Sequence, residues 1–206
     1  RSFQTSLEKN PDNSQALISV GRVLVRLGRN DEARTTFEEM IERNPDSIVT
    51  RMSIAEIKLA ENDSTGAMAA YREILNIKDD FAPAANNLAW LIADDPDGDL
   101  GEALRLAMLA KQAQPDNPDI SDTLGWVHYK RGTATLAIPQ FELALVSRPG
   151  DPTITYHLAL ALHSDTQSEK AREVLRVALA EGKGFQDREK AADLLRELDG
   201  SIAKEN

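Results

Sequence analysis

Small and apolar residues recur along this chain with the spacing of a single helix face. Counted from residue 14, Leu17, Val20, Gly21 and Leu24 occupy the fourth, seventh, eighth and eleventh positions. Residues three or four apart lie on one side of an α-helix, so the spacing predicts an amphipathic helix that buries one face. The eighth position is small again in later stretches, where it is Ala55, Ala89, Gly125 or Ala159.

The helical pattern returns at a period of about 34 residues, which is typical of stacked helical hairpins. An alanine, a phenylalanine four residues later and a proline eight further on occur as Ala33, Phe37, Pro45 and again as Ala137, Phe141, Pro149. The period predicts five full units at 14–47, 48–81, 82–117, 118–151 and 152–185. We expect residues 1–13 to be the second half of a truncated repeat and residues 186–206 to form a capping helix and tail.

Residues that end or begin helices mark the predicted boundaries. Gly28 and Gly132 fall where the first helix of a unit should end in a left-handed residue, and Asn62 is suited to the same conformation. Asn117-Pro118 and Asp151-Pro152 pair a capping side chain with a proline suited to the first helical position. These signals predict a turn inside the unit and a new helix directly after each unit boundary.

The combination of Leu-Gly, Ala-x-x-x-Phe and Pro resembles the tetratricopeptide repeat family, and the best matches are the first unit and the fourth, with Leu124-Gly125. The pattern departs from the family at Asp79 and Lys183 in place of proline, at Ala107 in place of the aromatic, and at Pro139 inside a predicted helix. The third unit also has two extra residues within 94–99. The resemblance implies an all-α fold, a right-handed superhelical α-solenoid of helix-turn-helix hairpins.

In the family that the chain resembles, the first helices line a concave surface that faces the ligand. The positions similar to the family's usual ligand-facing set predict a partner-binding surface for a protein or peptide. Its candidate residues are Arg22, Met52, Glu56, Asn86, Asn87, Trp90, Asp122, Trp126, Tyr129 and Tyr156.

Trp90 and Trp126 share the ninth position of their units, on a stripe offset from the predicted buried face. One interpretation is that they anchor an extended or helical segment of a partner, since aromatic side chains commonly carry binding energy. The other is that each tryptophan packs against a neighbouring first helix and stabilises the stack. The pattern leaves both interpretations open.

Some tetratricopeptide domains clamp a C-terminal carboxylate with lysine, arginine and asparagine. The corresponding positions here hold Ile18, Arg22, Ser53, Pro83 and Asn87, and the register one unit later fits no better. The chain is therefore not expected to bind its partner by that clamp.

Composition narrows the class of partner and of chemistry. With 41% hydrophobic and 28% charged residues the chain is neither disordered nor membrane-inserted by composition. Its formal charge of −10 opposes binding to nucleic acid, because a phosphate backbone repels an acidic protein. The absence of cysteine excludes disulfides and thiol chemistry.

No motif supports catalysis, a cofactor or a metal. A histidine-based zinc motif, a serine nucleophile motif and a phosphate-binding loop are all missing from the sequence. The acidic run 94–99 has carboxylates at alternating positions, but an EF-hand needs glycine and glutamate where Leu100 and Leu106 stand. Asp99 is better suited to capping the next helix. We expect no enzyme, no cofactor and no metal site, and ligand or base roles for His157 and His163 are not expected.

Residues 86–91, 122–126, 156–159 and 182–185 are also similar to the C-terminal end of bacterial repeat proteins associated with exosortase and exopolysaccharide systems. That resemblance implies an envelope-associated, periplasmic scaffold for polymer export or protein sorting. Two alternatives stay open: a structural scaffold that self-assembles through Phe3 and Leu7 of the truncated end, and a regulatory region of a larger protein. The sequence does not otherwise indicate a compartment.

Overall fold

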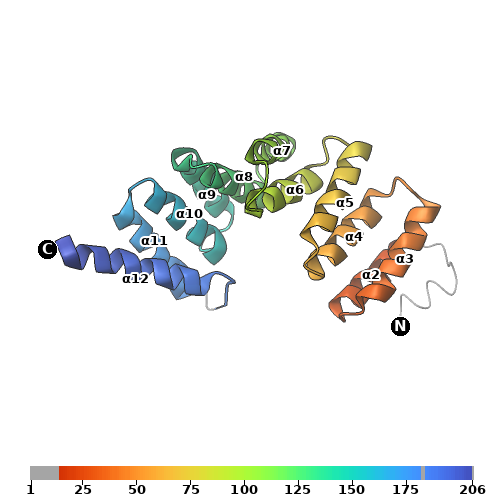
Figure 1. The fold of residues 1–206 in the computed structure, drawn as a ribbon, viewed down its shortest axis with the longest axis horizontal. Helices are drawn as coiled ribbons and strands as arrows, with labels where there is room; N and C mark the ends of the chain where they lie inside the picture. The colour runs from red at the N-terminus through yellow and green to blue at the C-terminus, as the bar shows by residue number, and fades with distance from the viewer. Residues whose placement is uncertain (1–13, 182–183, 206) are drawn as a thin grey trace. The chain divides into compact units, whose positions relative to one another are not determined.

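The computed structural model describes residues 14–181 and 184–205, and within these ranges it contains eleven α-helices and no strand (Figure 1). The predicted all-α fold of helical hairpins is confirmed. The predicted role of residues 1–13, with Phe3 and Leu7, lies outside the described residues. In chain order the helices are α2 (Ser14–Arg26), α3 (Asn30–Arg43), α4 (Ile48–Ala60), α5 (Ser64–Ile77), α6 (Ala82–Asp94), α7 (Leu100–Ala113), α8 (Pro118–Lys130), α9 (Ala134–Ser147), α10 (Pro152–Ser164), α11 (Ser168–Glu181) and α12 (Arg188–Glu205).

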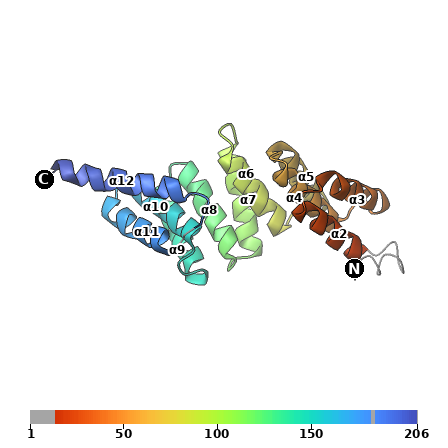
Figure 2. The same cartoon turned by 90° about the horizontal axis from the view of Figure 1, so that it is seen from below.

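The chain divides into two compact units, residues 1–91 and 92–206. In the first unit, α2 packs against α3, α4 against α5, and α4 also against α2 and α3. In the second unit, α8 pairs with α9 and α10 with α11, while α7 lies against α8 and α12 against α11 (Figure 2). Each helix thus contacts mainly its neighbours in the chain, which is the contact pattern of a repeat protein.

Helix length alternates regularly from α2 to α11. Even-numbered helices have 13 residues and odd-numbered helices have 14. The two extra residues of the third repeat therefore lengthen only the connection 95–99 between α6 and α7. Gly98 is required there, because a Cβ at this position would lie 1.9 Å from the carbonyl oxygen of Ile92. The insertion leaves the neighbouring helices at their usual length.

The predicted helix boundaries have the expected local geometry. Gly28 and Gly132 end their helices with φ values of 71° and 74°, and Asn62 does the same at 59°. Asn117 Oδ1 accepts a hydrogen bond from Asp119 N, and Asp151 Oδ1 accepts from two backbone N–H groups in the same way. Thr166, with φ 62°, takes the left-handed conformation after α10 without being a residue type that signals it.

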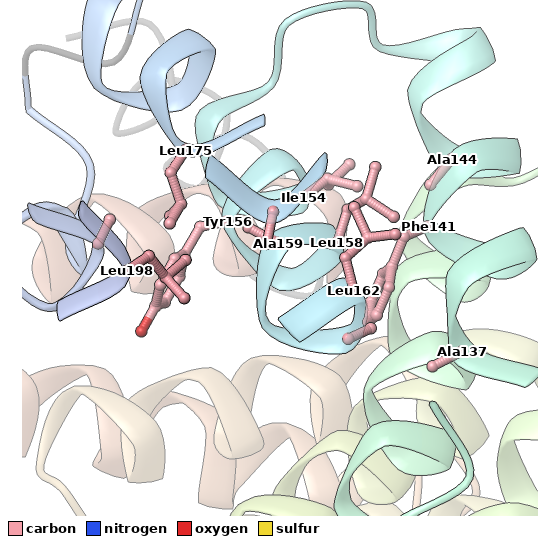
Figure 3. Packing of buried hydrophobic residues seen from close by; sticks show 13 residues of the cluster. Ala137, Phe141, Ala144, Ile154, Tyr156, Leu158, Ala159, Leu162, Leu175 and Leu198 are labelled. Atoms are coloured by element: carbon pink, nitrogen blue, oxygen red, sulfur yellow. The ribbon is translucent and has the colours of Figure 1, made fainter. Parts of the chain in front are cut away.

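Within each unit the core lies between the helices that pack against each other. In residues 92–206, Phe141 of α9 is fully buried and points toward Leu158 and Leu162 of α10 (Figure 3). Gly125 of α8 faces the Phe141 ring, which fills the space a side chain would need. Pro139 lies on the exposed side of α9, where the helix tolerates the lost backbone donor because water can solvate the freed carbonyl.

Candidate functional site

Two partly buried aromatic side chains lie together on α8. Trp126 and Tyr129 are three residues apart on the same side of the helix, and their ring centroids are 5.3 Å apart. Neither ring is fully covered by the rest of the chain. We call these two residues the aromatic face of α8. It offers a partner an apolar surface together with one polar group, the phenol hydroxyl of Tyr129.

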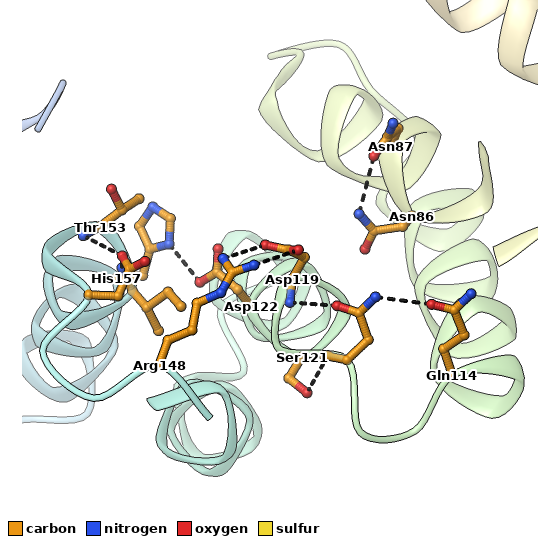
Figure 4. Close-up of polar contacts among 12 residues, drawn as sticks. Asn86, Asn87, Gln114, Asp119, Ser121, Asp122, Arg148, Thr153 and His157 are labelled. Carbon is orange, nitrogen blue, oxygen red and sulfur yellow. Dashed lines mark hydrogen bonds and ion pairs between the residues drawn. The ribbon is translucent and has the colours of Figure 1, made fainter. Parts of the chain in front are cut away.

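A buried histidine–aspartate pair supports the aromatic face. Nδ1 of His157 on α10 lies 2.8 Å from Asp122 Oδ1, at hydrogen-bond distance (Figure 4). The imidazole centroid lies 4.6 Å from the ring centroid of Trp126. The His157 and Asp122 side chains are 3% and 15% exposed. A carboxylate accepts hydrogen bonds, so the geometry indicates that Nδ1–H of His157 is the donor. The pair fixes the imidazole ring against which Trp126 packs.

Tyr156 is buried beside His157. It is 6% exposed, and its ring centroid lies 6.2 Å from Phe185, in the segment before α12. Burial, helped by the negative charge of Asp187 and by Tyr129, raises the pKa of Tyr156 to about 12. Burial also raises the pKa of Tyr129. Both phenols therefore keep their protons near neutral pH, and the hydroxyl of the partly exposed Tyr129 can donate a hydrogen bond to a ligand.

A lysine of the same helix lies over the tryptophan ring. Lys130 Nζ is 5.4 Å from the Trp126 centroid, within the range of a cation–π interaction, and 3.8 Å from Asp94 Oδ1. The Lys130 and Asp94 side chains are 32% and 61% exposed. At one side of the aromatic face, the Lys130 ammonium therefore interacts with both the Asp94 carboxylate and the Trp126 ring.

A second group of candidate residues lies on α6, within residues 1–91. Asn87 Nδ2 donates to the hydroxyl of the buried Tyr71 at 3.1 Å, and Asn86 Nδ2 donates to Asn87 Oδ1 at 3.3 Å. Asn86 Oδ1 is buried and accepts no hydrogen bond from the described residues. Trp90 is partly buried one turn further along α6. Asn87 therefore has a structural partner, whereas the buried Oδ1 of Asn86 has none among the described residues.

The remaining candidates form an ordinary surface. Arg22 of α2 and Glu56 of α4 make an exposed ion pair of 3.8 Å, and exposed pairs of this kind contribute about 0–1 kcal/mol. Met52 is partly buried on α4. These residues occupy first helices, as predicted, but their contacts do not single them out as a site.

The structure brings four of the predicted residues together within residues 92–206, namely Asp122, Trp126, Tyr129 and Tyr156. His157 is a neighbour of Asp122, Trp126 and Tyr156. The sequence indicated no ligand or base role for His157 and did not reveal this structural role. Lys130 and Asp94 were missed as well. Lys130 stands four residues after Trp126, a spacing at which helical side chains meet, and that local signal was available. The pairing of Asp122 with His157 had no local signal, because the two are 35 residues apart.

The acidic segment between α6 and α7 uses its carboxylates locally. Asp95 Oδ1 accepts a hydrogen bond from Asp97 N at 3.0 Å, and Asp99 Oδ1 caps α7 by accepting from Gly101 N at 2.7 Å. In residues 14–181 and 184–205 no three His, Asp or Glu side chains are grouped so as to hold a metal ion. No helix in the described ranges combines the length and the apolar character that a membrane crossing requires.

Comparison with family models identifies the repeats. Two models described as tetratricopeptide repeat match residues 1–57 and residues 123–184. The second match contains the aromatic face, His157 and the hairpin α10–α11. The two matches lie on opposite sides of the connection 95–99, where the third repeat departs from the regular length.

Similar proteins agree with this assignment. A TPR repeat-containing protein of Pseudomonas aeruginosa is 26% identical over 66% of this chain, and the chain spans 29% of that relative's length. The solved structure of PilW, a type IV pilus biogenesis factor, is 19% identical with a TM-score of 0.76, covering 93% of this chain and 92% of PilW. YrrB, a TPR protein with an unusual peptide-binding site, is 14% identical with a TM-score of 0.69, covering 94% and 98%. The repeat period, the helical hairpins and these matches together lead to one conclusion: the chain is a tetratricopeptide repeat protein.

Proposed function

We propose that this chain is a non-enzymatic scaffold that binds a partner protein through a peptide segment seated on its first helices. The observation that carries the proposal is the aromatic face of α8. Trp126 and Tyr129 are partly exposed, although burial of a large aromatic ring is energetically favourable. The buried His157–Asp122 pair holds the Trp126 ring from behind. A rigid aromatic surface loses little conformational entropy on binding, which favours its use as an anchor.

One similar protein supports the proposal. YrrB, which has the same fold, is described as having a peptide-binding site. Within residues 1–91 we keep Arg22, Met52, Glu56, Asn86, Asn87 and Trp90 as proposed partner-binding residues. Within residues 92–206, Asp122 and Tyr156 are the buried support of the aromatic face.

The test is selection from a random peptide library, followed by affinity measurement on purified chain. We expect enriched peptides whose affinity falls at least about tenfold in the variant Trp126→Leu/Tyr129→Leu, a loss of about 1.4 kcal/mol. The matched control is Met108→Ala/Val177→Ala, which removes two exposed apolar side chains from α7 and α11. Circular dichroism must show that both variants are folded. Equal binding by the parent and the α8 variant would place the binding surface elsewhere.

The cellular process is proposed on sequence similarity. The segments 86–91 and 122–126 resemble bacterial repeat proteins of exosortase and exopolysaccharide systems, and we propose that the chain serves as an envelope-associated scaffold in polymer export or protein sorting. Fractionation of the source cells tests this proposal. Recovery of the protein with the envelope or periplasmic fraction supports it, and recovery with the cytoplasm contradicts it.

A second candidate function is self-association, favoured by an exposed apolar stripe on α9. Leu136, Leu143 and Val146 are 52%, 45% and 75% exposed, and with the exposed Pro139 they follow a spacing of three and four residues along one side of the helix. Such a stripe is typical of a helix that packs against another helix. The surface differs from the truncated end at residues 1–13 for which self-association was predicted from the sequence.

A further inference from the structure

We infer that the aromatic face of α8 selects a basic partner segment, and that an arginine or lysine side chain of this partner binds between the Asp94 carboxylate and the Trp126 ring. In the free protein Lys130 fills this position. The inference rests on the proposed function, because it names the chemistry of the segment that the aromatic face would bind.

The geometry around Lys130 indicates the class of ligand. Its Nζ lies 3.8 Å from Asp94 Oδ1 and 5.4 Å from the Trp126 centroid, so the ammonium is near both groups and in close contact with neither. The first distance is close to the 4.0 Å limit for an ion pair. An arginine from a partner can lie flat on an indole ring while its fork of N–H donors reaches a carboxylate, which a lysine on the same helix as the ring cannot do. The chain thus holds a loosely bound cation where a better-placed one would fit.

Displacement of Lys130 has a low cost. Its side chain is 32% exposed and ends the helix, so it can turn into solvent without opening the core. Asp94 is 61% exposed and ends α6, which leaves its carboxylate accessible. Trp126 stays in place during the exchange because His157 and Tyr129 contact its ring.

Charge favours the same partner. Residues 92–206 contain 20 acidic and 13 basic side chains, a formal charge of −7 out of −10 for the whole chain. Two charged groups at the start of α12 also act on this region: Asp187 on Tyr156 and Lys190 on Asp94. They pair with each other at 2.7 Å. Asp122 is paired with His157. The surplus of carboxylates belongs to residues 92–206 as a whole, and at long range it repels an acidic peptide and attracts a basic one.

The experiment uses Trp126 as its own reporter in the Trp90→Phe variant, where it is the only tryptophan, after calorimetry has compared the affinity of this variant for the arginine peptide with that of the parent. The probes are the acetylated and amidated peptide Ser-Leu-Arg-Leu-Ser and its counterpart with citrulline, which keeps the shape of arginine and removes the charge. Binding is followed by the change in Trp126 fluorescence at low and at physiological salt. The variants Lys130→Met and Asp94→Asn are compared in the same background, and circular dichroism checks their fold.

We expect saturable binding of the arginine peptide, at least tenfold weaker binding of the citrulline peptide, and weaker binding of the arginine peptide as salt rises. Lys130→Met should bind the arginine peptide at least threefold more tightly, because the competing cation is gone. Asp94→Asn should bind it at least threefold more weakly.

Three results would overturn the inference. Equal affinity for the two peptides would show that the aromatic face binds peptide without reading charge, which leaves the proposed function standing. Unchanged or weaker binding in Lys130→Met would show that Lys130 does not occupy the ligand's position. Failure of both peptides to bind, while peptides selected from the library still require Trp126 and Tyr129, would reject the basic partner and retain the aromatic face; failure in both experiments would reject the proposed function as well.

Discussion

Gly21 lies directly against the ring of Phe37, so closely that a Cβ on Gly21 would fall 2.2 Å from Phe37 Cζ. The same relationship recurs in the fourth repeat, where a Cβ on Gly125 would lie 2.7 Å from Phe141 Cε1. In both hairpins the aromatic ring of the second helix occupies the volume that the first helix leaves empty. The helices approach each other at this point because the glycine has no side chain.

The close approach predicts that Gly125→Ala destabilises the protein. Alanine is the better helix former by about 1 kcal/mol, but overpacking a filled core costs about 1–3 kcal/mol, so the net effect should be a loss of stability. Urea denaturation measures it. Gly200→Ala is the control, since a Cβ on Gly200 of α12 meets nothing within 4 Å and should leave stability unchanged or raised.

A smaller side chain in place of Phe141 should restore part of the stability that Gly125→Ala loses. At the positions that correspond to Gly125 and Phe141, the fifth repeat has Ala159 and Leu175, both fully buried. The double variant Gly125→Ala/Phe141→Leu should therefore lose less stability than the sum of its single changes. Strictly additive losses would mean that the two positions are not coupled through a shared space.

The His157–Asp122 hydrogen bond predicts a difference between two substitutions of Asp122. Asp122→Ala leaves the buried Nδ1–H without an acceptor, and an unsatisfied buried donor costs about 1–3 kcal/mol. Asp122→Asn keeps an oxygen acceptor in the same place and should cost less. Thermal unfolding followed by circular dichroism compares the two, and Trp126 emission reports whether the aromatic face has moved. Equal losses would argue against a stabilising role for the hydrogen bond.

The three tyrosines predict an unusual alkaline titration. Burial raises the pKa of Tyr71, Tyr129 and Tyr156 above the ordinary value of 10.0, for Tyr156 to about 12. The folded state therefore holds its phenolic protons at pH values where the unfolded state has released them. Their contribution to stability is complete below pH 10 and is lost as the pH rises toward 12, because the unfolded state then binds fewer protons.

Near-ultraviolet absorbance of tyrosinate measures this effect. At pH 10 the native protein should show well under half of its full tyrosinate signal, and addition of denaturant at the same pH should raise the signal to about half. A native titration centred on pH 10 would show that the phenols are solvated in solution.

The exposed stripe on α9 predicts concentration-dependent self-association. Leu143→Glu/Val146→Glu places two charges on the stripe, where the side chains are 45% and 75% exposed, so the fold should be unaffected. Sedimentation velocity should show association of the parent and a monomer for the variant. A parent that is monomeric at high concentration would remove self-association from the candidate functions.

Local signals allowed much of the fold to be predicted from the sequence. Gly28, Gly132, Asn117-Pro118 and Asp151-Pro152 act through their own backbone or capping geometry, and each does in the structure what its residue type favours. Thr166 shows the limit of such signals. It takes the left-handed conformation because α10 and α11 must turn there, and tertiary packing overrides the preference of the residue.

The candidate site was predictable only in part. Tyr156 was expected on the ligand-facing surface, and it is 6% exposed because Phe185 and the start of α12 lie beside it. Helix periodicity gives the side of a helix on which a residue lies but not what a later segment places over that side. The Asp122–His157 pair depends likewise on the packing of α8 with α10, which no spacing within a single helix encodes.

The match between Gly125 and Phe141 also bears on how such a chain can change over evolutionary time. Each glycine and its ring belong to one hairpin, so duplication or deletion of a whole hairpin carries the fitted pair along intact. Loss or gain of one residue within either helix would rotate the glycine or the ring about its helix axis, so that the two would no longer face each other. The two residues added between α6 and α7 fall in a connection, where they disturb no such pair. Changes in length are thus tolerated in whole hairpins or in turns, and the number of repeats can vary more freely than the length of any helix.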